Sequence, residues 1–422
     1  MLIWKVHSLS WKTASIRYRC LMPKLRLEQI GYRSLVMQKS NIKFKFEPED
    51  ILIFVKSFSP SDLELAREAQ AANVPIILDL CDNIFVQDYT DMDGYRQSDI
   101  FREMAKISRL IVVSVDALKD VIEQELNPQI PVVVIPDGLE NNNDIAYALS
   151  YVKTKAYILD YLRYPRFLTY GLGLLAQYSL KLVKITLKKP IRYFLEQWVK
   201  QEPPTPETAD QDDVDCQDDH NLTNKIDDQI QHHSNHKTGY KKIVWFGHHG
   251  GAKHDSFGLL NLLELAPDLS QISKEIDIEL VVISNNERMY KKLFLDLPFK
   301  SSYLEWDLFN SSDYIQSGDV TIIPNNRSPF SMCKSANRAV LSLSLGVPIV
   351  ANKIPAFEVF NDCMLFDDWQ QGIKTYLTNP DLAHAHIARA QEIIHDQFGD
   401  DVIAQKWDEA IKSTQQIACQ TA

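Results

Sequence analysis

The sequence predicts an α/β protein with two Rossmann-like domains, separated by a basic helical insert and a disordered acidic linker. Its 422 residues, 45% of them hydrophobic, are enough for two separate cores. In both halves, short apolar runs alternate with helical patterns, as in parallel sheets covered by helices. Charge marks the middle of the chain: residues 151–200 carry ten Lys and Arg against two acids, and residues 201–240 carry two Lys against ten acids.

The first domain is expected over residues 1–142. Runs such as IIL and VVVI are apolar at every position, which indicates strands buried on both faces. Gly31 ends the first helical pattern, and Ser59 begins the second. The expected strands are 2–6, 50–56, 75–80, 109–114 and 131–136, and the expected helices are 15–31 and 59–74.

The last domain, residues 240–422, repeats this alternation. It begins with the strand KKIVWFG and continues with strands that end in polar or glycine-rich segments. The expected strands are 241–247, 278–284, 319–324 and 347–351. The expected helices are 256–266, 286–294, 334–345, 368–378, 382–396 and 399–417.

The insert, residues 143–200, has the pattern of an element at a membrane surface. A helix is expected between Pro165 and Pro190, with an uncharged stretch too short and polar to span a bilayer. Its apolar face would hold Leu168, Leu172, Leu175 and Leu182. The cations expected to bind the membrane are Lys181, Lys184, Lys188 and Arg192. The alternatives are packing against the protein itself and binding a nucleic-acid or protein partner.

The linker, residues 201–239, is acidic and poor in large apolar residues, so we expect it to be disordered. Its four histidines could be considered as metal ligands, but no fold would fix their geometry. We therefore expect no metal site.

The composition also excludes several classes of protein. A net charge of −11 disfavours general nucleic-acid binding. Six scattered cysteines form no C-x-x-C pair, which is typical of free thiols in a reducing cytoplasm. The sequence has neither a signal-peptide pattern nor a run of 18 apolar residues. We expect a cytoplasmic protein, peripheral on the inner face of the membrane.

Two candidate binding segments follow strands of the last domain, where open α/β sheets bind ligands. The first contains Gly247, Gly250, Gly251 and Lys253, a loop in which backbone N–H groups can approach a phosphate. A tight turn is the alternative. The second contains Lys334, Ser335 and Asn337, expected at the start of a helix, where a cation, a hydroxyl and the helix dipole suit a diphosphate. The alternatives are a solvated lysine and a serine N-cap.

Two further candidates lie in the first domain. Asp79 and Asp82 end a strand and could act as a base or bind acceptor hydroxyls. Alternatively, Asp82 caps the next helix and Asp79 pairs with a basic residue. Ser15, Arg17 and Arg19 open the first helix and would suit an acceptor or a phosphate, unless the arginines are ordinary surface residues.

These segments together resemble the GT-B glycosyltransferases, specifically the large retaining family 4 (glycosyltransferase group 1). The resemblance rests on KIVWFGHHGG and on SGDVTIIPNNRSPFSMCKSANRAVLSLSLGVPIVANKIPAFEVF, which contains K-S-x-N-[KR], G-x-P-V-V-like and P-x-x-E patterns. The segments RYRCLMPKLRLEQIGYR and VKSFSPSDLELAREAQAANVPIILDLCDN look like the acceptor half. The resemblance covers residues 1–140 and 241–418.

The resemblance implies transfer of a sugar from a nucleoside diphosphate sugar to an acceptor hydroxyl, without a cofactor. Gly247, Gly250 and Gly251 would approach the diphosphate, and Lys334 and Ser335 would hold it. Asn337 and Glu358 would lie near the nucleotide or the donor sugar. The last helix would cross back to the first domain.

One position departs from the family: Leu341 stands where a glutamate usually binds the ribose.

The insert suggests an acceptor at the membrane surface, in envelope polysaccharide or glycolipid synthesis. The alternatives are an inactive GT-B scaffold attached to the membrane and another nucleotide-sugar enzyme, such as an epimerase.

Overall fold

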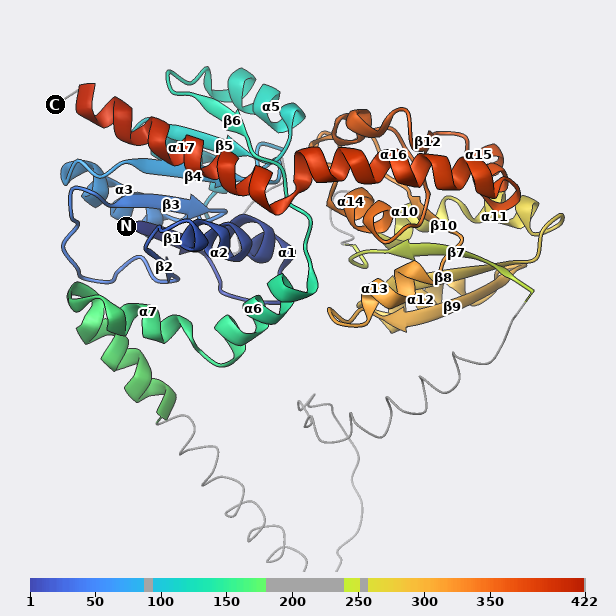
Figure 1. Cartoon of the computed structure of the whole chain (residues 1–422), viewed down its shortest axis with the longest axis horizontal. Helices are drawn as coiled ribbons and strands as arrows, with labels where there is room; N and C mark the ends of the chain where they lie inside the picture. The colour runs from blue at the N-terminus through green and yellow to red at the C-terminus, as the bar shows by residue number, and fades with distance from the viewer. Residues whose placement is uncertain (87–93, 180–238, 251–256, 421–422) are drawn as a thin grey trace, which may run out of the picture. The chain divides into compact units, whose positions relative to one another are not determined.

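The computed structural model describes residues 1–86, 94–179, 239–250 and 257–420, and the side chains up to residue 415. Within these ranges the chain forms two parallel six-stranded sheets with helices on both faces (Figure 1). Residues 180–238 lie outside the described ranges, and with them the cations Lys181, Lys184, Lys188 and Arg192 and the predicted acidic linker up to residue 238. Two parallel sheets confirm the predicted class of fold.

The sheet of the first domain has the order β2-β1-β3-β4-β5-β6. Its first strand, β1, pairs with both β2 and β3, so the connections change direction there. The strands are β1 (Leu2–Val6), β2 (Ser34–Met37), β3 (Ile51–Val55), β4 (Ile76–Leu80), β5 (Leu110–Val113) and β6 (Val132–Val134). Most of their residues are buried, as the continuous apolar runs predict.

The predicted first helix is one continuous helical segment with three parts. Its middle turn is π-helical, and Pro23 directly follows that turn, at the start of the last part. The helices of this domain are α1 (Ala14–Ile16), η1 (Arg17–Leu21), α2 (Met22–Gln29), α3 (Pro60–Ala71), α4 (Gln97–Ala105), α5 (Asp116–Leu126), α6 (Asn142–Lys153), α7 (Tyr157–Arg163) and η2 (Pro165–Phe167).

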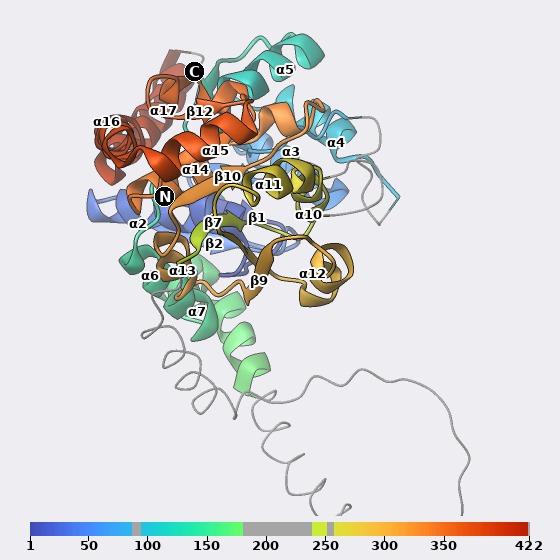
Figure 2. The ribbon, with the colours of Figure 1, turned by 90° about the vertical axis from the view of Figure 1, so that its right-hand side faces the viewer.

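The sheet of the second domain has the order β12-β11-β10-β7-β8-β9, with its change of direction at β7, between β10 and β8. The strands are β7 (Lys241–Phe246), β8 (Ile278–Ser284), β9 (Lys300–Glu305), β10 (Val320–Ile323), β11 (Ile349–Ala351) and β12 (Leu365–Phe366). One apolar cluster lies on each face of β7 and β8, so helices cover both faces of the sheet (Figure 2).

The helices of the second domain include three long ones near the end of the chain. They are α10 (Leu259–Leu263), α11 (Ala266–Ile272), α12 (Glu287–Phe294), α13 (Ser311–Gln316), η3 (Ser331–Cys333), α14 (Asn337–Ser344), η4 (Pro355–Phe360), α15 (Trp369–Thr378), α16 (Pro380–Phe398) and α17 (Asp400–Gln420). As the resemblance implies, α17 returns to the first domain: it packs against α2, and Trp407 lies in the first core.

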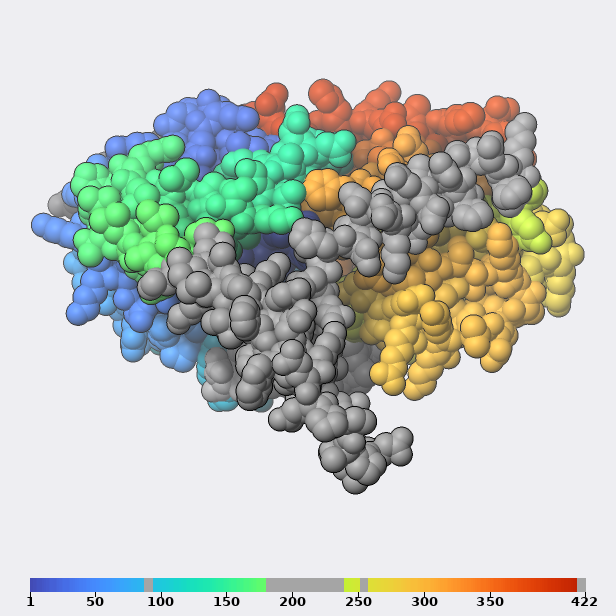
Figure 3. Space-filling model, turned by 90° about the horizontal axis from the view of Figure 1, so that it is seen from below, coloured from blue at the N-terminus to red at the C-terminus, as the bar shows by residue number. Residues whose placement is uncertain are grey.

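The first part of the predicted insert packs against the first domain. Tyr151, Ile158 and Tyr161 are buried, and the Tyr161 hydroxyl donates to the Val36 carbonyl of β2 at 2.9 Å. Figure 3 shows α6 and α7, in green, spread over the residues of the first domain, in blue. Internal packing, one of the alternatives, is therefore what the structure shows for residues 142–167. A further helix follows over residues 168–179.

Candidate functional site

The loop after β7 begins one candidate binding surface, at the carboxyl end of a strand where the sheet changes direction. Gly250 has a φ of +101°, and a Cβ there would lie 2.1 Å from the Phe257 carbonyl oxygen, so only glycine fits. The Gly250 N–H donates to His248 Nδ1 at 3.1 Å, which shapes the turn. Gly247 is also part of this loop, whereas Gly251 and Lys253 lie outside the described residues.

The segment after β10 lies at the same edge of the sheet. The predicted helix 334–345 is shorter than expected: it begins at Asn337, and Lys334 has extended backbone angles. Lys334 and Ser335 therefore precede the helix rather than open it. Ala336 is the N-cap and has no side-chain capping bond, so the alternative that Ser335 caps the helix is wrong.

Lys334 already has an anionic partner. Its ammonium group donates to Asp82 Oδ1 at 2.7 Å, across from the end of β4 in the first domain. The same ammonium lies 3.9 Å from the centre of the Phe330 ring, a cation–π contact. Its side chain keeps 38% of its exposure, so solvent still reaches it. Lys334 thus joins the loops that follow β4 and β10.

Arg338 is a functional candidate that sequence reasoning missed. Its Nη1 would lie 3.5 Å from a Cβ placed on Gly247, so the guanidinium borders the glycine loop. Its Nη2 donates to Asn325 Oδ1 at 3.1 Å, and no carboxylate among the described residues pairs with it. Burial lowers the pKa of Arg338 to about 10, and the group stays charged at neutral pH. Its place in the K-S-x-N-[KR] pattern was the signal available in the sequence.

Asp82 bridges two ammonium groups, one from each domain. Its second oxygen accepts from Lys56, which follows β3 in a left-handed conformation with φ +45°. Burial opposes ionisation, but attraction to Lys56 and Lys334 holds the pKa of Asp82 well below its usual range. A carboxylate this stable is a poor proton acceptor. It also caps no described helix, so that alternative is not observed.

Asp79 and Arg19 form a buried ion pair instead of an exposed site. Arg19 Nε donates to both oxygens of Asp79, at 3.1 and 3.2 Å, and both side chains are essentially unexposed. The expected roles of Asp79 as a base and Arg19 as an acceptor-binding residue are therefore corrected. The physical reason is that Arg19 and Asp79, at the end of β4, are buried together, where pairing offsets the cost of burying each charge.

Arg17 is likewise unavailable to an acceptor or a phosphate, because Glu140 accepts from its guanidinium and both side chains are nearly buried. Ser15 alone of the three expected acceptor residues remains partly exposed. The alternative that the arginines are ordinary surface residues is wrong as well, since both lie inside the first domain.

Three remaining candidates lie near the carboxyl edge of the second sheet. Ser335 and Asn337 flank the start of α14 and are partly exposed, and Glu358 is exposed on η4, which contacts η3. Within the described part of the chain, none of these three side chains has a hydrogen-bond partner. They are therefore available to a ligand.

Leu341 is partly buried. It packs against the apolar cluster on one face of the second sheet, as Trp306 and Tyr314 also do. The described residues contain no group of three or more His, Cys, Asp or Glu side chains that could hold a metal ion.

Comparisons with known proteins place the fold. No family model matches the chain, and no curated protein matches its sequence. A glycosyltransferase from Rickettsia africae ESF-5 matches with a TM-score of 0.58 and 12% identity over 98% of each chain. Anabaena HepE, solved with UDP and glucose, matches with a TM-score of 0.55 and 13% identity over 98% of this chain and 100% of its own.

A third match is the sucrose-phosphate synthase of Thermosynechococcus elongatus, with a TM-score of 0.52 and 11% identity over 99% of this chain and 100% of that one. These identities are too low to transfer an activity, but the matches extend over both domains. The chain has the GT-B fold of these glycosyltransferases.

Proposed function

We propose that this protein is a glycosyltransferase that moves a sugar from a nucleoside diphosphate sugar to an acceptor hydroxyl. The observation that carries the proposal is that two cations after β10, Lys334 and Arg338, lie at the same edge of the sheet as the glycine loop at Gly247 and Gly250, which Arg338 borders. All four lie where the second sheet changes direction, the usual ligand position in such sheets. Because HepE was solved with UDP, uridine nucleotides are the first donors to test.

The proposed site suits departure of a diphosphate. As the bond between the sugar and the diphosphate breaks, negative charge grows on the leaving phosphate oxygens. Lys334 and Arg338 would stabilise that charge, and backbone N–H groups of the glycine loop would add hydrogen bonds. Ser335, Asn337 and Glu358 are free to contact the nucleotide or the sugar. Neither Asp79 nor Asp82 is needed as a base.

Binding of UDP, GDP and ADP by calorimetry tests the donor site. We expect saturable binding of one nucleotide, weakened at least about tenfold in both Lys334→Ala and Arg338→Ala, because each removes a cation from the diphosphate. Lys412→Ala and Arg389→Ala are matched controls, since both residues are exposed and lie on helices away from the glycine loop. Equal binding by the site variants and the controls would place the nucleotide elsewhere.

Incubation with the sugar nucleotide that matches the bound base distinguishes a glycosyltransferase from an epimerase. Transfer or slow hydrolysis of the matching sugar nucleotide identifies a transferase, whereas conversion to an isomeric sugar nucleotide identifies an epimerase. Leu341 is the observation that favours an inactive scaffold, because it offers no oxygen to a ribose hydroxyl. Binding of no nucleotide at all would support that scaffold.

We further propose that the protein binds the cytoplasmic face of an anionic membrane, where it meets a lipid-linked acceptor in envelope polysaccharide or glycolipid synthesis. Leu168, Leu172 and Leu175 recur at helical spacing along 168–179 and keep 41–51% of their exposure. The basic residues expected to bind lipid follow directly in the sequence. No described helix is long and apolar enough to span a bilayer.

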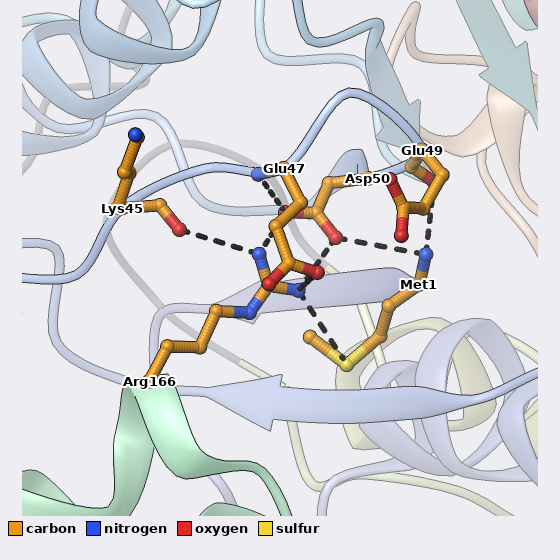
Figure 4. Close-up of polar contacts among 6 residues, drawn as sticks. All are labelled: Met1, Lys45, Glu47, Glu49, Asp50 and Arg166. Carbon is orange, nitrogen blue, oxygen red and sulfur yellow. Dashed lines mark hydrogen bonds and ion pairs between the residues drawn. The ribbon is translucent and has the colours of Figure 1, made fainter.

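Arg166 anchors the chain just before this helix to the first domain. Its two terminal nitrogens donate to the two oxygens of buried Asp50, at 2.5 and 2.7 Å, and Nη1 also donates to the Lys45 carbonyl at 3.3 Å (Figure 4). Fork-shaped pairing of this kind holds a guanidinium in one orientation. These contacts tie the chain to the first domain at residue 166, just before the helix proposed to bind the membrane.

Co-sedimentation with liposomes tests the membrane proposal. We expect binding to vesicles containing phosphatidylglycerol at low salt, and weaker binding at high salt or to neutral vesicles. Replacing Leu168, Leu172 and Leu175 together by Ser should reduce binding severalfold. Leu295→Ser is the control, because Leu295 is 75% exposed but lies at the end of α12. Failure of the unmodified protein to sediment with anionic vesicles would refute the proposal.

A further inference from the structure

The two cations of the proposed donor site, Lys334 and Arg338, differ in their ionic partners. Lys334 is neutralised by a carboxylate of the other domain, while Arg338 next to it has no carboxylate partner among the described residues. A carboxylate oxygen and a phosphate oxygen are the same kind of acceptor for an ammonium group. Asp82 therefore occupies one of the positions that a donor phosphate would take.

We infer that Asp82 is an internal counter-ion that the donor diphosphate displaces from Lys334, so that Asp82 lowers the affinity of the unliganded site for nucleotide. This inference rests on the proposed function and concerns the same site. A ligand that must first break the Lys334–Asp82 contact binds only the fraction of molecules in which that contact is open. Asp82 thus acts as a determinant of affinity rather than as a catalytic residue.

The Asp82 carboxylate keeps one cationic partner when Lys334 leaves it, which lowers the free-energy cost of the exchange. Asp82 uses its two oxygens separately: Oδ1 accepts from Lys334, and Oδ2 accepts from Lys56. When Lys334 turns to a phosphate, Lys56 still neutralises Asp82, so no unpaired charge is left at a side chain that is only 15% exposed. The Phe330 ring beside the Lys334 ammonium keeps that ammonium near the site during the exchange.

Other contacts hold the two domains together when the ion pair opens, one to the loop after β4 and one to α5. Asn83 Nδ2 donates to the Pro329 carbonyl at 3.3 Å, and the Cys333 thiol lies 3.8 Å from the Ala117 carbonyl oxygen. The Asp82→Asn substitution preserves side-chain volume and leaves these contacts in place. It therefore changes the competition for Lys334 without removing the only link between the loops.

The test is calorimetric titration of UDP, or of the nucleotide that the unmodified protein binds, at constant salt. We expect Asp82→Asn to bind about threefold to fivefold more tightly than the unmodified protein, the effect of losing one partly exposed ion pair. Asp319→Asn is the matched control: it removes the same charge and breaks the Lys241–Asp319 pair at the opposite end of β10. That control should bind as the unmodified protein does.

A double variant locates the effect. In a Lys334→Ala background, Asp82→Asn should give no gain in affinity, because its competitor is gone. The inference is wrong if Asp82→Asn binds equally or more weakly, if Asp319→Asn gains as much, or if the gain persists without Lys334. In each of these cases, the proposed donor site is still supported if nucleotide binding continues to depend on Arg338. If no variant binds any nucleotide, the proposed function fails, and the inference fails with it.

Discussion

Gly250 illustrates how a single residue decides whether the donor loop can form. Its positive φ and its contact with the Phe257 carbonyl are two separate constraints, and both exclude a side chain. Gly346, which follows α14, has a similar φ of +79° but open space around its missing Cβ. A side chain at Gly346 would cost only the strain of a positive φ, whereas a side chain at Gly250 would also collide with the Phe257 carbonyl.

At the residue scale, we predict that Gly250→Ala moves the loop and weakens UDP binding by more than about tenfold, since the backbone N–H groups lose their positions. Gly346→Ala should cost about 1 kcal/mol of stability without changing affinity. Calorimetry and urea unfolding measure the two effects. Unchanged nucleotide affinity in Gly250→Ala would remove this loop from the binding site.

Helix α3 shows how an element can be held by a single carboxylate at its first turn. Asp62 accepts from the Ser59 backbone N–H at 2.9 Å, while the Ser59 hydroxyl accepts from the Asp62 N–H at 3.2 Å, completing a capping box. The same carboxylate pairs with buried Lys5 at 2.9 Å. The start of α3 is thereby tied to β1, close to the edge of the first sheet.

At the scale of the element, Asp62→Asn should destabilise the protein by about 3 kcal/mol at pH 7, because the buried Lys5 ammonium loses its carboxylate partner. Burial opposes ionisation of Asp62, but attraction to Lys5 lowers its pKa below the ordinary 3.8. The contribution of a carboxylate with a lowered folded pKa is complete above the unfolded value and is lost as the pH falls through the folded value. The gap between the two proteins should therefore narrow below about pH 3.8.

Urea unfolding between pH 7 and pH 3 measures this gap. Asp396→Asn is the control, because Asp396 is exposed near the end of α16. A gap that stays constant across this range would show that the Asp62 carboxylate is not responsible for it.

At the scale of the whole molecule, α17 links the end of the chain to the beginning. Trp407 is fully buried and meets Trp4 of β1 edge-on, with ring centres 5.2 Å apart. The Tyr32 hydroxyl donates to Asp408 at 2.7 Å, next to that contact. The last helix therefore contributes to the core of the first domain, beside the N-terminal sheet (Figure 1).

We predict that Trp407→Ala destabilises the protein by about 3–5 kcal/mol, because it empties a large volume in the first core. Trp407→Phe should cost less, since part of the contact with Trp4 remains. Urea unfolding followed by tryptophan fluorescence and by far-UV circular dichroism measures both. A cost below about 1 kcal/mol for the alanine variant would mean that the first domain does not depend on α17.

The three strands that sequence reasoning missed, β2, β9 and β12, all lie at an edge of a sheet. Edge strands have one neighbour and can be polar, so the KSSYLE of β9 shows no clear strand pattern. The other two are short, with four residues in β2 and two in β12. Central strands are covered on both faces and therefore need apolar residues at most positions. Their apolar runs were recognisable because both of their faces are buried.

The sequence by itself determined the α/β class, the central parallel strands, the long C-terminal helices and the glycine loop, because each depends on residues close together in the chain. Only the tertiary structure decided which charged residues remain available. Asp79 meets Arg19 from 60 residues away, and Asp82 meets Lys334 from 252 residues away. A carboxylate buried against a cation and one open to a ligand look alike in a sequence, since the difference between them is the distance to a partner that folding brings near.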